Sequence, residues 1–324
     1  MNATHKSIVV VTGGQMGLGY EAALVIANDS PDRLVIIASR SSGEQAAQKI
    51  NQETGNANVR YHKLDLADLN HVRRFASEIL AYGLPVGALV LNAGIQTMNL
   101  SYTTDGIETT FGVNHVGHAL LFYLLQPHFD DNARVVITSS GTHDPAQKTG
   151  IPAPKYVNAE LLAHPDQVSM SYPGRQRYST SKFCNVMWMY ALDRHRKSEG
   201  LSFTVTAMDP GMMPGTGLAR DANSLERFLW HHLLPRIVPL LRLLFPNTHT
   251  PQESGRALAR LAISPEVDNV SGAYFEGVKA IKSSQDSYDE RKQEDLWKWT
   301  AEFLGRSNEE VEAYQQLSNP GTNA

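Results

Sequence analysis

The feature of this sequence that most restricts its fold is an alternation of short apolar runs with longer segments of helical periodicity. Several runs are almost wholly apolar, as strands of a parallel sheet are when helices cover both faces. Strands that alternate with helices predict an α/β protein whose doubly wound parallel sheet has right-handed crossovers. The expected strands are residues 8–11, 34–38, 59–63, 88–91, 134–138, 202–208 and 273–276, and the expected helices are residues 19–27, 43–53, 69–82, 105–129, 178–199 and 252–263, followed by a charged helical tail.

Two segments interrupt this alternation. Residues 141–177 are polar and rich in Pro and Gly, which predicts a substrate loop, and residues 211–250 contain an apolar stretch broken by prolines. We interpret residues 1–324 as one domain with an inserted substrate cap. The apolar part, residues 225–245, is compatible with a lid, a membrane-contacting surface or a subunit contact, and a lid over a medium-sized apolar substrate is favoured.

Composition restricts the partners and the location. Hydrophobic residues make up 42% of the chain and the formal net charge is −4, so no general attraction to nucleic acid is expected. Cys184 is the single cysteine, which excludes an internal disulfide and favours a reducing compartment. The first residues lack the pattern of a signal peptide, and residues 225–245 carry too many charges for a transmembrane segment. These features predict a cytoplasmic protein acting on a small molecule.

A glycine-rich segment follows the first expected strand and opens the next helix. Residues 12–19 read Thr-Gly-Gly-Gln-Met-Gly-Leu-Gly. Glycines let the backbone turn sharply and approach a pyrophosphate, which the free N–H groups of the helix N-terminus then bind. The segment predicts a Rossmann-type dinucleotide site. Its candidate cofactor-binding residues are Gly13, Gln15, Met16, Gly17, Leu18 and Gly19.

The end of the second strand indicates which dinucleotide binds. Ser39 and Arg40 stand where a protein that binds NAD usually has a carboxylate for the ribose hydroxyls. An arginine there suits a 2′-phosphate, on which its guanidinium donates two charge-assisted hydrogen bonds. NADPH/NADP+ is therefore the expected cofactor, although Arg40 also fits the description of a solvated loop charge.

Two further strand ends contribute candidates with alternative interpretations. Asp65, before Leu66, either hydrogen-bonds the adenine or caps the helix that begins near Asp68. The small residues of the run 92–94 let the chain pass beside the cofactor, although its asparagine is also a common turn former. This run is Asn92, Ala93 and Gly94.

The second half of the chain contains a candidate acid–base pair. Tyr178 and Lys182 are four residues apart, so they share one face of a helix. An adjacent ammonium favours the phenolate, and we expect it to lower the pKa of Tyr178 so that this residue acts as general acid or base. Ser140, at a strand end, is placed to hydrogen-bond a carbonyl oxygen, and Asn114 to hold a water that links Lys182 to solvent.

These motifs occur together in one order along the chain. The glycine-rich segment, Asn92-Ala93-Gly94, Asn114, Ser139-Ser140, Tyr178 with Lys182, and Asp209-Pro210-Gly211 span roughly residues 8–216. In this combination the chain resembles the short-chain dehydrogenase/reductase family. The resemblance implies a catalytic tetrad of Asn114, Ser140, Tyr178 and Lys182, and adds Tyr178, Lys182, Pro210 and Gly211 to the cofactor-binding residues.

Within that family the sequence resembles the retinol dehydrogenase and protochlorophyllide reductase branch. Arg40 and the run 114–118, Asn-His-Val-Gly-His, carry this likeness. Protochlorophyllide reductases have a second cysteine where this chain has Met212, which argues against light-driven C=C reduction. Cys184 is expected to be a small core residue.

The predicted function is an NADPH-dependent oxidoreductase that interconverts a carbonyl and an alcohol by hydride transfer. The alternatives are a non-catalytic NADP(H)-binding regulator and a reductase of activated C=C bonds. His115, His118 and His143 do not form a known ligand set, so no metal is expected. The resemblance also allows a homodimer through the helices of residues 105–129 and 178–199.

Overall fold

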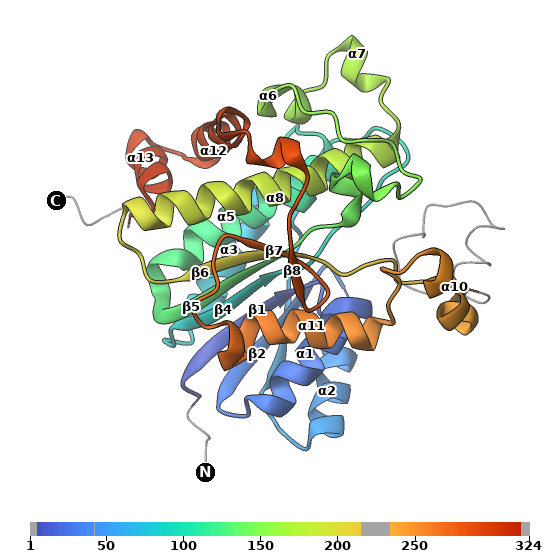
Figure 1. Cartoon of the computed structure of the whole chain (residues 1–324). Helices are drawn as coiled ribbons and strands as arrows, with labels where there is room; N and C mark the ends of the chain where they lie inside the picture. The colour runs from blue at the N-terminus through green and yellow to red at the C-terminus, as the bar shows by residue number, and fades with distance from the viewer. Residues whose placement is uncertain (1–4, 42, 215–233, 319–324) are drawn as a thin grey trace.

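One eight-stranded sheet forms the centre of the computed structural model (Figure 1), which describes residues 5–41, 43–214 and 234–318. The strand order is β3-β2-β1-β4-β5-β6-β7-β8, parallel throughout except for β8, which is antiparallel to β7. The strands are β1 (Ser7–Thr12), β2 (Arg33–Ser39), β3 (Val59–Lys63), β4 (Val86–Leu91), β5 (Phe129–Thr138), β6 (Thr204–Asp209), β7 (Ala273–Glu276) and β8 (Lys279–Ile281). The predicted doubly wound Rossmann-type α/β fold is confirmed.

Helices cover both faces of this sheet (Figure 1). Alternate residues of β1 belong to different cores: Ile8 and Val10 pack on one side, Val9 and Val11 on the other. This burial on both faces explains why the strands are almost wholly apolar. The longer helices are α1 (Gly17–Asp29), α2 (Gly43–Thr54), α3 (Leu69–Leu80), α5 (Gly117–Leu125), α8 (Gly174–Ser198), α11 (Pro251–Ile263), α12 (Glu290–Leu304) and α13 (Asn308–Gln316).

The helix expected over residues 105–129 is shorter and less regular than predicted. It begins with α4 (Thr109–Phe111), continues as a π-helical turn, η1 (Gly112–Val116), and ends with α5. The Glu108 side chain accepts a hydrogen bond from the Phe111 N–H and so caps the start, while Pro127 lies in the 3₁₀ turn that follows α5. Phe129 already belongs to β5. The short edge strand β8 was not predicted, because Lys279 and Ala280 are exposed and form no apolar run.

The charged C-terminal segment is not a loose tail. Its helices α12 and α13 pack over α8 and α5 (Figure 1), where the Tyr314 ring stacks on Tyr123 with centroids 4.5 Å apart and Trp297 is buried. The outer face of α5 and α8 is therefore covered by the chain itself. A homodimer remains a prediction, and it would need a different surface from the one that the resemblance indicates.

The loop and the cap both contain short helices. Residues 141–177 include η3 (Gly141–His143), η4 (Pro145–Gln147), α6 (Ala159–Ala163), α7 (Gln167–Met170) and the start of α8. The described part of the cap contains η7 (Leu234–Ile237) and α10 (Val238–Leu244), while the predictions for residues 215–233 lie outside the described residues.

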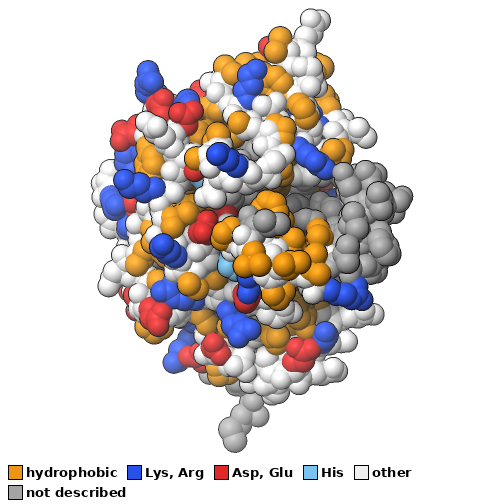
Figure 2. All heavy atoms as spheres, turned by 45° about the vertical axis from the view of Figure 1, so that its right-hand side comes forward, with side chains coloured by type: hydrophobic (Ala, Val, Ile, Leu, Met, Phe, Trp, Pro, Cys, Tyr) orange, Lys and Arg blue, Asp and Glu red, His pale blue; other side chains and the backbone are white. Residues whose placement is uncertain are grey.

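Apolar side chains gather on the face of the molecule shown in Figure 2. On and directly after α10, Leu240, Leu243 and Phe245 are exposed by 60%, 77% and 52%. No helix within residues 5–41, 43–214 and 234–318 combines the length and the hydropathy needed to cross a bilayer.

Candidate active site

A cavity of about 990 Å³ lies at the edge of the sheet where the parallel strands have their carboxyl ends. This is the edge at which open α/β sheets bind ligands. Of the predicted site residues, Asn114 alone does not line the cavity. Those that line it are Gly13, Gln15, Met16, Gly17, Leu18, Gly19, Ser39, Arg40, Asp65, Leu66, Asn92, Ala93, Gly94, Ser140, Tyr178, Lys182, Pro210 and Gly211.

The glycine-rich loop has the geometry that a dinucleotide requires. Gly13 and Gly17 adopt φ of 70° and 56°, and a Cβ on Gly19 would stand 2.4 Å from the Gly13 carbonyl oxygen. Met16, the N-cap of α1, makes no side-chain hydrogen bond to the first turn of the helix. The N–H groups of that turn therefore have no side-chain cap and are available to a phosphate. The loop fits the expected cofactor.

Thr12 joins the loops that follow β1 and β4, and sequence reasoning did not single it out. Its hydroxyl accepts hydrogen bonds from the N–H groups of Asn92 and Ala93, each at 2.9 Å. Asn92 extends the link, because its Nδ2 donates to the Thr12 carbonyl at 2.9 Å and its Oδ1 accepts from the Thr138 hydroxyl at 3.3 Å. The Asn92 amide thus ties the ends of β1 and β5 together across β4.

The opposite end of the cavity contains the residues expected to bind the adenosine half of the cofactor. Arg40 is exposed at its rim. Asp68, and not Asp65, caps α3 by accepting a hydrogen bond from the His71 N–H at 3.0 Å. Asp65 accepts from the Ala67 N–H at 3.0 Å and lines the cavity, so the capping alternative does not account for it.

Tyr178 and Lys182 lie on the same face of α8, as their spacing predicts. The Lys182 Nζ is 5.7 Å from the centre of the Tyr178 ring, and both residues are buried at the inner end of the cavity. Nζ also donates a hydrogen bond to the Thr138 carbonyl oxygen at 2.9 Å. The amine is therefore anchored to the end of β5, beside the strand end that carries Ser140.

The protonation of this pair differs from the expectation. Burial raises the pKa of Tyr178, the negative charge of Asp209 raises it further, and the hydrogen bond with Ser140 acts in the opposite direction. Burial lowers the pKa of Lys182 to about 8, against the opposing influence of Asp209. The prediction that the phenol pKa is lowered is wrong for the protein alone, because burial of the phenol and the charge of Asp209 both raise it. Tyr178 is thus a protonated phenol, suited to the role of an acid.

Ser140 is held in position through both its side chain and its backbone. Its Oγ accepts a hydrogen bond from the Thr142 N–H at 3.3 Å, so its own proton can be donated either to Tyr178 or to a ligand. Its carbonyl oxygen lies 2.7 Å from His143 Nδ1. The Ser284 N–H donates to His143 Nε2 at 3.0 Å, so Nε2 must be unprotonated and Nδ1 must carry the proton. A neutral His143, whose pKa burial lowers, therefore anchors the Ser140 backbone.

Asn114 lies behind the cavity wall. Within η1 its side chain accepts a hydrogen bond from the Ile95 N–H at 2.8 Å and donates to the Ile95 carbonyl and to the Ser181 hydroxyl, each at 2.9 Å. A Cβ on Gly94 would lie 3.3 Å from the Lys182 Nζ and 3.4 Å from the Asn114 Oδ1. Asn114 thus shapes the wall beside Lys182, while its role in holding a water stays a prediction.

The three histidines that raised the question of a metal have partners inside the protein. His115 Nε2 lies 2.9 Å from the Thr300 hydroxyl, and His118 Nε2 lies 2.9 Å from the Thr12 hydroxyl. Burial lowers the pKa of each of these two histidines to about 3, so both are neutral. In the described part of the chain, no group of three His, Cys, Asp or Glu residues is arranged as a metal site. Cys184 is fully buried, as predicted.

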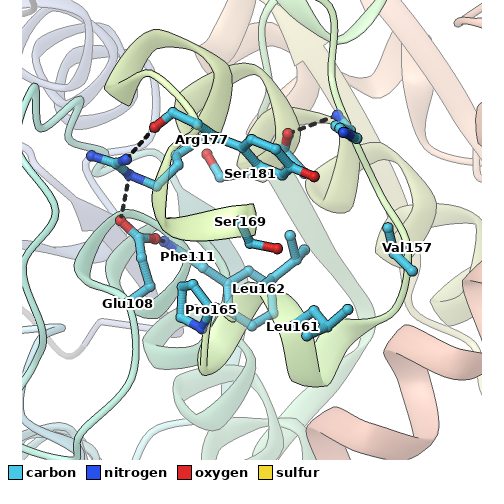
Figure 3. A pocket seen from close by; sticks show the side chains of 12 residues that line it. Glu108, Phe111, Val157, Leu161, Leu162, Pro165, Ser169, Arg177 and Ser181 are labelled. Atoms are coloured by element: carbon cyan, nitrogen blue, oxygen red, sulfur yellow. Dashed lines mark hydrogen bonds and ion pairs between the residues drawn. The ribbon is translucent and has the colours of Figure 1, made fainter. Parts of the chain in front are cut away.

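The residue before Tyr178 belongs to a buried ion pair that sequence reasoning missed (Figure 3). The Arg177 Nε lies 3.3 Å from the Glu108 Oε1, with side chains 8% and 3% exposed. Arg177 also donates to the carbonyl oxygens of Tyr172 at 2.6 Å and Met98 at 3.3 Å. The pair borders a small cavity of about 30 Å³, separate from the large one, and connects the first turn of α8 to α4.

A Rossmann-type sheet whose glycine-rich loop lines one cavity together with Ser140, Tyr178 and Lys182 is typical of nicotinamide-dependent oxidoreductases. Two family models match the chain: short chain dehydrogenase over residues 7–152 and AcuH dehydrogenase domain over residues 219–313. The chain belongs to the short-chain dehydrogenase family, in its retinol dehydrogenase-like branch.

Relatives support this assignment along most of the chain. Human polyprenol dehydrogenase is 31% identical over 304 residues, which cover 92% of this chain and 85% of that protein. Human retinol dehydrogenase 12 is 32% identical over 302 residues, covering 92% and 86%. Among solved structures, an uncharacterised protein from Mycobacterium paratuberculosis matches with a TM-score of 0.65 and 25% identity, covering 93% of this chain and 94% of that one.

Proposed function

We propose that this protein is an NADPH-dependent oxidoreductase that interconverts a carbonyl and an alcohol on a medium-sized apolar substrate. One observation carries the proposal: a single cavity is lined by the phosphate-binding loop, by Arg40 at its rim and by Ser140, Tyr178 and Lys182 at its inner end. A protein that only senses NADP(H) has no chemical need for this acid–base group.

In the reduction direction, Tyr178 donates its phenolic proton to the carbonyl oxygen. The raised pKa of Tyr178 keeps that proton in place until negative charge develops on the oxygen. Ser140 donates a second hydrogen bond to the same oxygen, and Lys182 stabilises the phenolate that forms. The nicotinamide supplies or accepts the hydride when the cofactor is bound. The glycine-rich loop, Arg40 and Asp65 hold its phosphates and adenosine.

The substrate class follows from the lining of the inner cavity. Apart from the groups named above, its walls combine apolar side chains with polar ones such as Gln147 and Asn247, and the apolar ones include Ile95, Val113, Ile151, Met213 and Phe245. Apolar walls with a few convergent polar groups suit a ligand that is a hydrocarbon with one reactive oxygen. The names of the relatives, polyprenol dehydrogenase and retinol dehydrogenase 12, describe alcohols of this kind. We propose an apolar alcohol and its aldehyde or ketone as the substrate pair.

Purified protein supplied with NADPH and a panel of apolar aldehydes and ketones tests this function. Loss of nicotinamide absorbance with formation of the corresponding alcohol is the expected result. Binding of NADPH without turnover of any carbonyl or of the matching alcohols would favour a regulator. Turnover confined to enones, with the carbonyl retained in the product, would instead identify a C=C reductase.

Cofactor preference gives a second prediction. Replacing Arg40 with alanine is expected to weaken NADPH binding by roughly 10- to 100-fold, because charge-assisted hydrogen bonds contribute about 1.5–3 kcal/mol. NADH lacks the 2′-phosphate, so its Kd is expected to change little. Calorimetric titration of both cofactors measures the two effects, and an equal loss for both would remove the argument for NADPH. Arg60→Ala, on β3 and outside the cavity lining, is the matched control.

A further inference from the structure

A buried carboxylate stands at the reactive end of the cavity. Asp209 is the last residue of β6, 3% exposed, and it lines the cavity together with Ser140, Tyr178 and Lys182. The strands place it beside the catalytic serine: Thr138 pairs with Met208 across β5 and β6, and the Ser139 N–H donates to the Met208 carbonyl. A Cβ on Gly141, the residue after Ser140, would lie 2.8 Å from the Asp209 Oδ2.

The hydrogen-bond partners of this carboxylate do not neutralise it. Its Oδ1 accepts from the Gly211 N–H at 3.0 Å, and its Oδ2 accepts from the Asn247 Nδ2 at 2.7 Å. Both donors are uncharged, and within the described residues no Lys, Arg or His lies in ion-pair contact with Asp209. These bonds fix the position of the carboxylate and leave its full negative charge to act on the cavity.

The charge of Asp209 influences four titratable groups around the reactive end. Its charge raises the pKa of Tyr178 and opposes the lowering of the pKa of Lys182, both on α8. It also acts in the raising direction on His143 of η3 and on Tyr274 of β7. Since His143 is neutral, Lys182 and Asp209 are the two buried charges of opposite sign at this end, whereas Lys148, which also lines the cavity, is exposed to solvent. The negative charge of Asp209 therefore compensates the positive charge of Lys182.

The nicotinamide must bind at this end, because the hydride donor and the proton donor act on the same substrate carbonyl. The reduced ring is neutral and the oxidised ring carries a positive charge. An unopposed Lys182 ammonium would repel the oxidised ring in a partly dry cavity, whereas a carboxylate beside it attracts that ring. We propose that Asp209 stabilises the oxidised cofactor relative to the reduced cofactor and so sets the ratio of their affinities.

This inference rests on the proposed NADP(H)-dependent function, and cofactor binding tests it without turnover. Asp209→Asn removes the charge at nearly constant shape. At pH 6.5, where Lys182 is protonated in the wild-type protein, the ratio of Kd for NADP+ to Kd for NADPH is expected to rise on the order of tenfold. Calorimetry for NADP+ and fluorescence titration for NADPH measure the two constants. An unchanged ratio would overturn the inference.

Asp131→Asn is the matched control, because it makes the same chemical change at an exposed position of β5 outside the cavity lining. In this control, the ratio of Kd for NADP+ to Kd for NADPH is expected to equal that of the wild-type protein. Asp209→Asn places an amide group beside the Asn247 amide that donates to the carboxylate in the wild type. Asp209→Ser removes the charge without this contact between two amides, so it serves as a second variant. Both variants are expected to shift the ratio in the same direction. If the wild-type protein binds neither NADP+ nor NADPH, the proposed function fails. If it binds both, but the ratio of the two Kd values does not change on substitution of Asp209, only the inference fails.

Discussion

Replacing Tyr178 with phenylalanine is expected to reduce kcat for carbonyl reduction by roughly 10²–10⁴-fold, the size of the contribution from a positioned general acid. Phenylalanine keeps the ring in its buried position and removes the proton donor. Because Lys182 is held by the Thr138 carbonyl oxygen, the cavity is expected to keep its shape. The Kd for NADPH should therefore stay near its wild-type value. Single-turnover kinetics with calorimetric binding separates the two quantities.

Tyr172→Phe is the control for this experiment. Tyr172 lines the small cavity near Arg177 and not the large one, so loss of its hydroxyl should leave kcat unchanged. A Tyr178→Phe protein that binds NADPH normally and reduces the carbonyl at the wild-type rate would contradict the mechanism. Loss of NADPH binding in that variant would point to a role for the hydroxyl in holding the cofactor.

The core and the cofactor end of this protein could be predicted from the sequence because they depend on local patterns. A strand buried on both faces must be apolar along its length, so β1, β2 and β4 are visible as uninterrupted runs. Parallel strands bring their carboxyl ends to one edge, and this rule places the glycine-rich loop, Arg40 and Ser140 together without knowledge of their contacts. The exposed edge strand β8 has no such pattern, and it was missed.

The polar contacts that shape the reactive end could not be predicted in the same way. Thr12, His143 and Asp209 act through residues that are far away in the sequence, such as the contact of His143 with Ser284. No spacing rule connects such pairs in a single sequence. The signal that was available for Asp209 is its position at the end of a buried strand, where a charged side chain must face either a partner or a ligand.

The protonation of Tyr178 was mispredicted for a related reason. The four-residue spacing correctly indicated that Lys182 is near, and proximity to an ammonium alone lowers the pKa of a phenol. Burial raises the pKa of Tyr178 and lowers the pKa of Lys182, so on both groups it disfavours the charged form. The size of this effect depends on the packing of the whole cavity. The charge of Asp209, which adds to the effect of burial on Tyr178, comes from the end of β6, far from α8 in the sequence.

Removing the guanidinium of Arg177 is expected to destabilise the protein by about 3–5 kcal/mol, because a buried charge is left without its partner. Arg177→Met keeps most of the apolar stem and leaves the Glu108 carboxylate 3% exposed without its counter-charge. Two backbone carbonyls, those of Tyr172 and Met98, also lose a donor. Chemical denaturation at pH 7.5 measures the difference in the free energy of unfolding.

The same variant carries a pH dependence whose sign follows from Glu108. Burial already raises the pKa of this carboxyl, and the hydrogen bonds with Phe111 and Thr110, together with the charge of Arg177, counteract the rise. Without Arg177 the pKa rises further, so the folded variant takes up a proton more readily than the unfolded chain. The penalty is present where the carboxyl is ionised and is relieved as the pH falls through its folded-state pKa. The stability difference between variant and wild type should therefore be smaller at pH 5 than at pH 7.5.

Two further variants separate the effect of breaking the buried ion pair from the effect of removing an arginine charge at the surface. The double variant Glu108→Gln with Arg177→Met should recover a large part of the lost stability, because a neutral amide still caps α4 through the Phe111 N–H. Arg291→Met breaks an ion pair with Asp289 in which the arginine side chain is 91% exposed, and it should leave the denaturation midpoint unchanged. Equal losses for Arg177→Met and Arg291→Met would contradict a special role of the buried pair.

The position of the pair connects this stability effect with the chemistry. Arg177 directly precedes Tyr178. Its ion pair with Glu108 (Figure 3) and its hydrogen bonds to the Tyr172 and Met98 carbonyls hold the first turn of α8. Displacement of that turn by a fraction of an ångström moves the phenol relative to the carbonyl oxygen that Ser140 also binds, and proton transfer depends steeply on the distance from the phenol to that oxygen. In the fraction of Arg177→Met that remains folded, kcat should therefore fall while the Kd for NADPH, which depends on the distant glycine-rich loop and Arg40, stays close to that of the wild type.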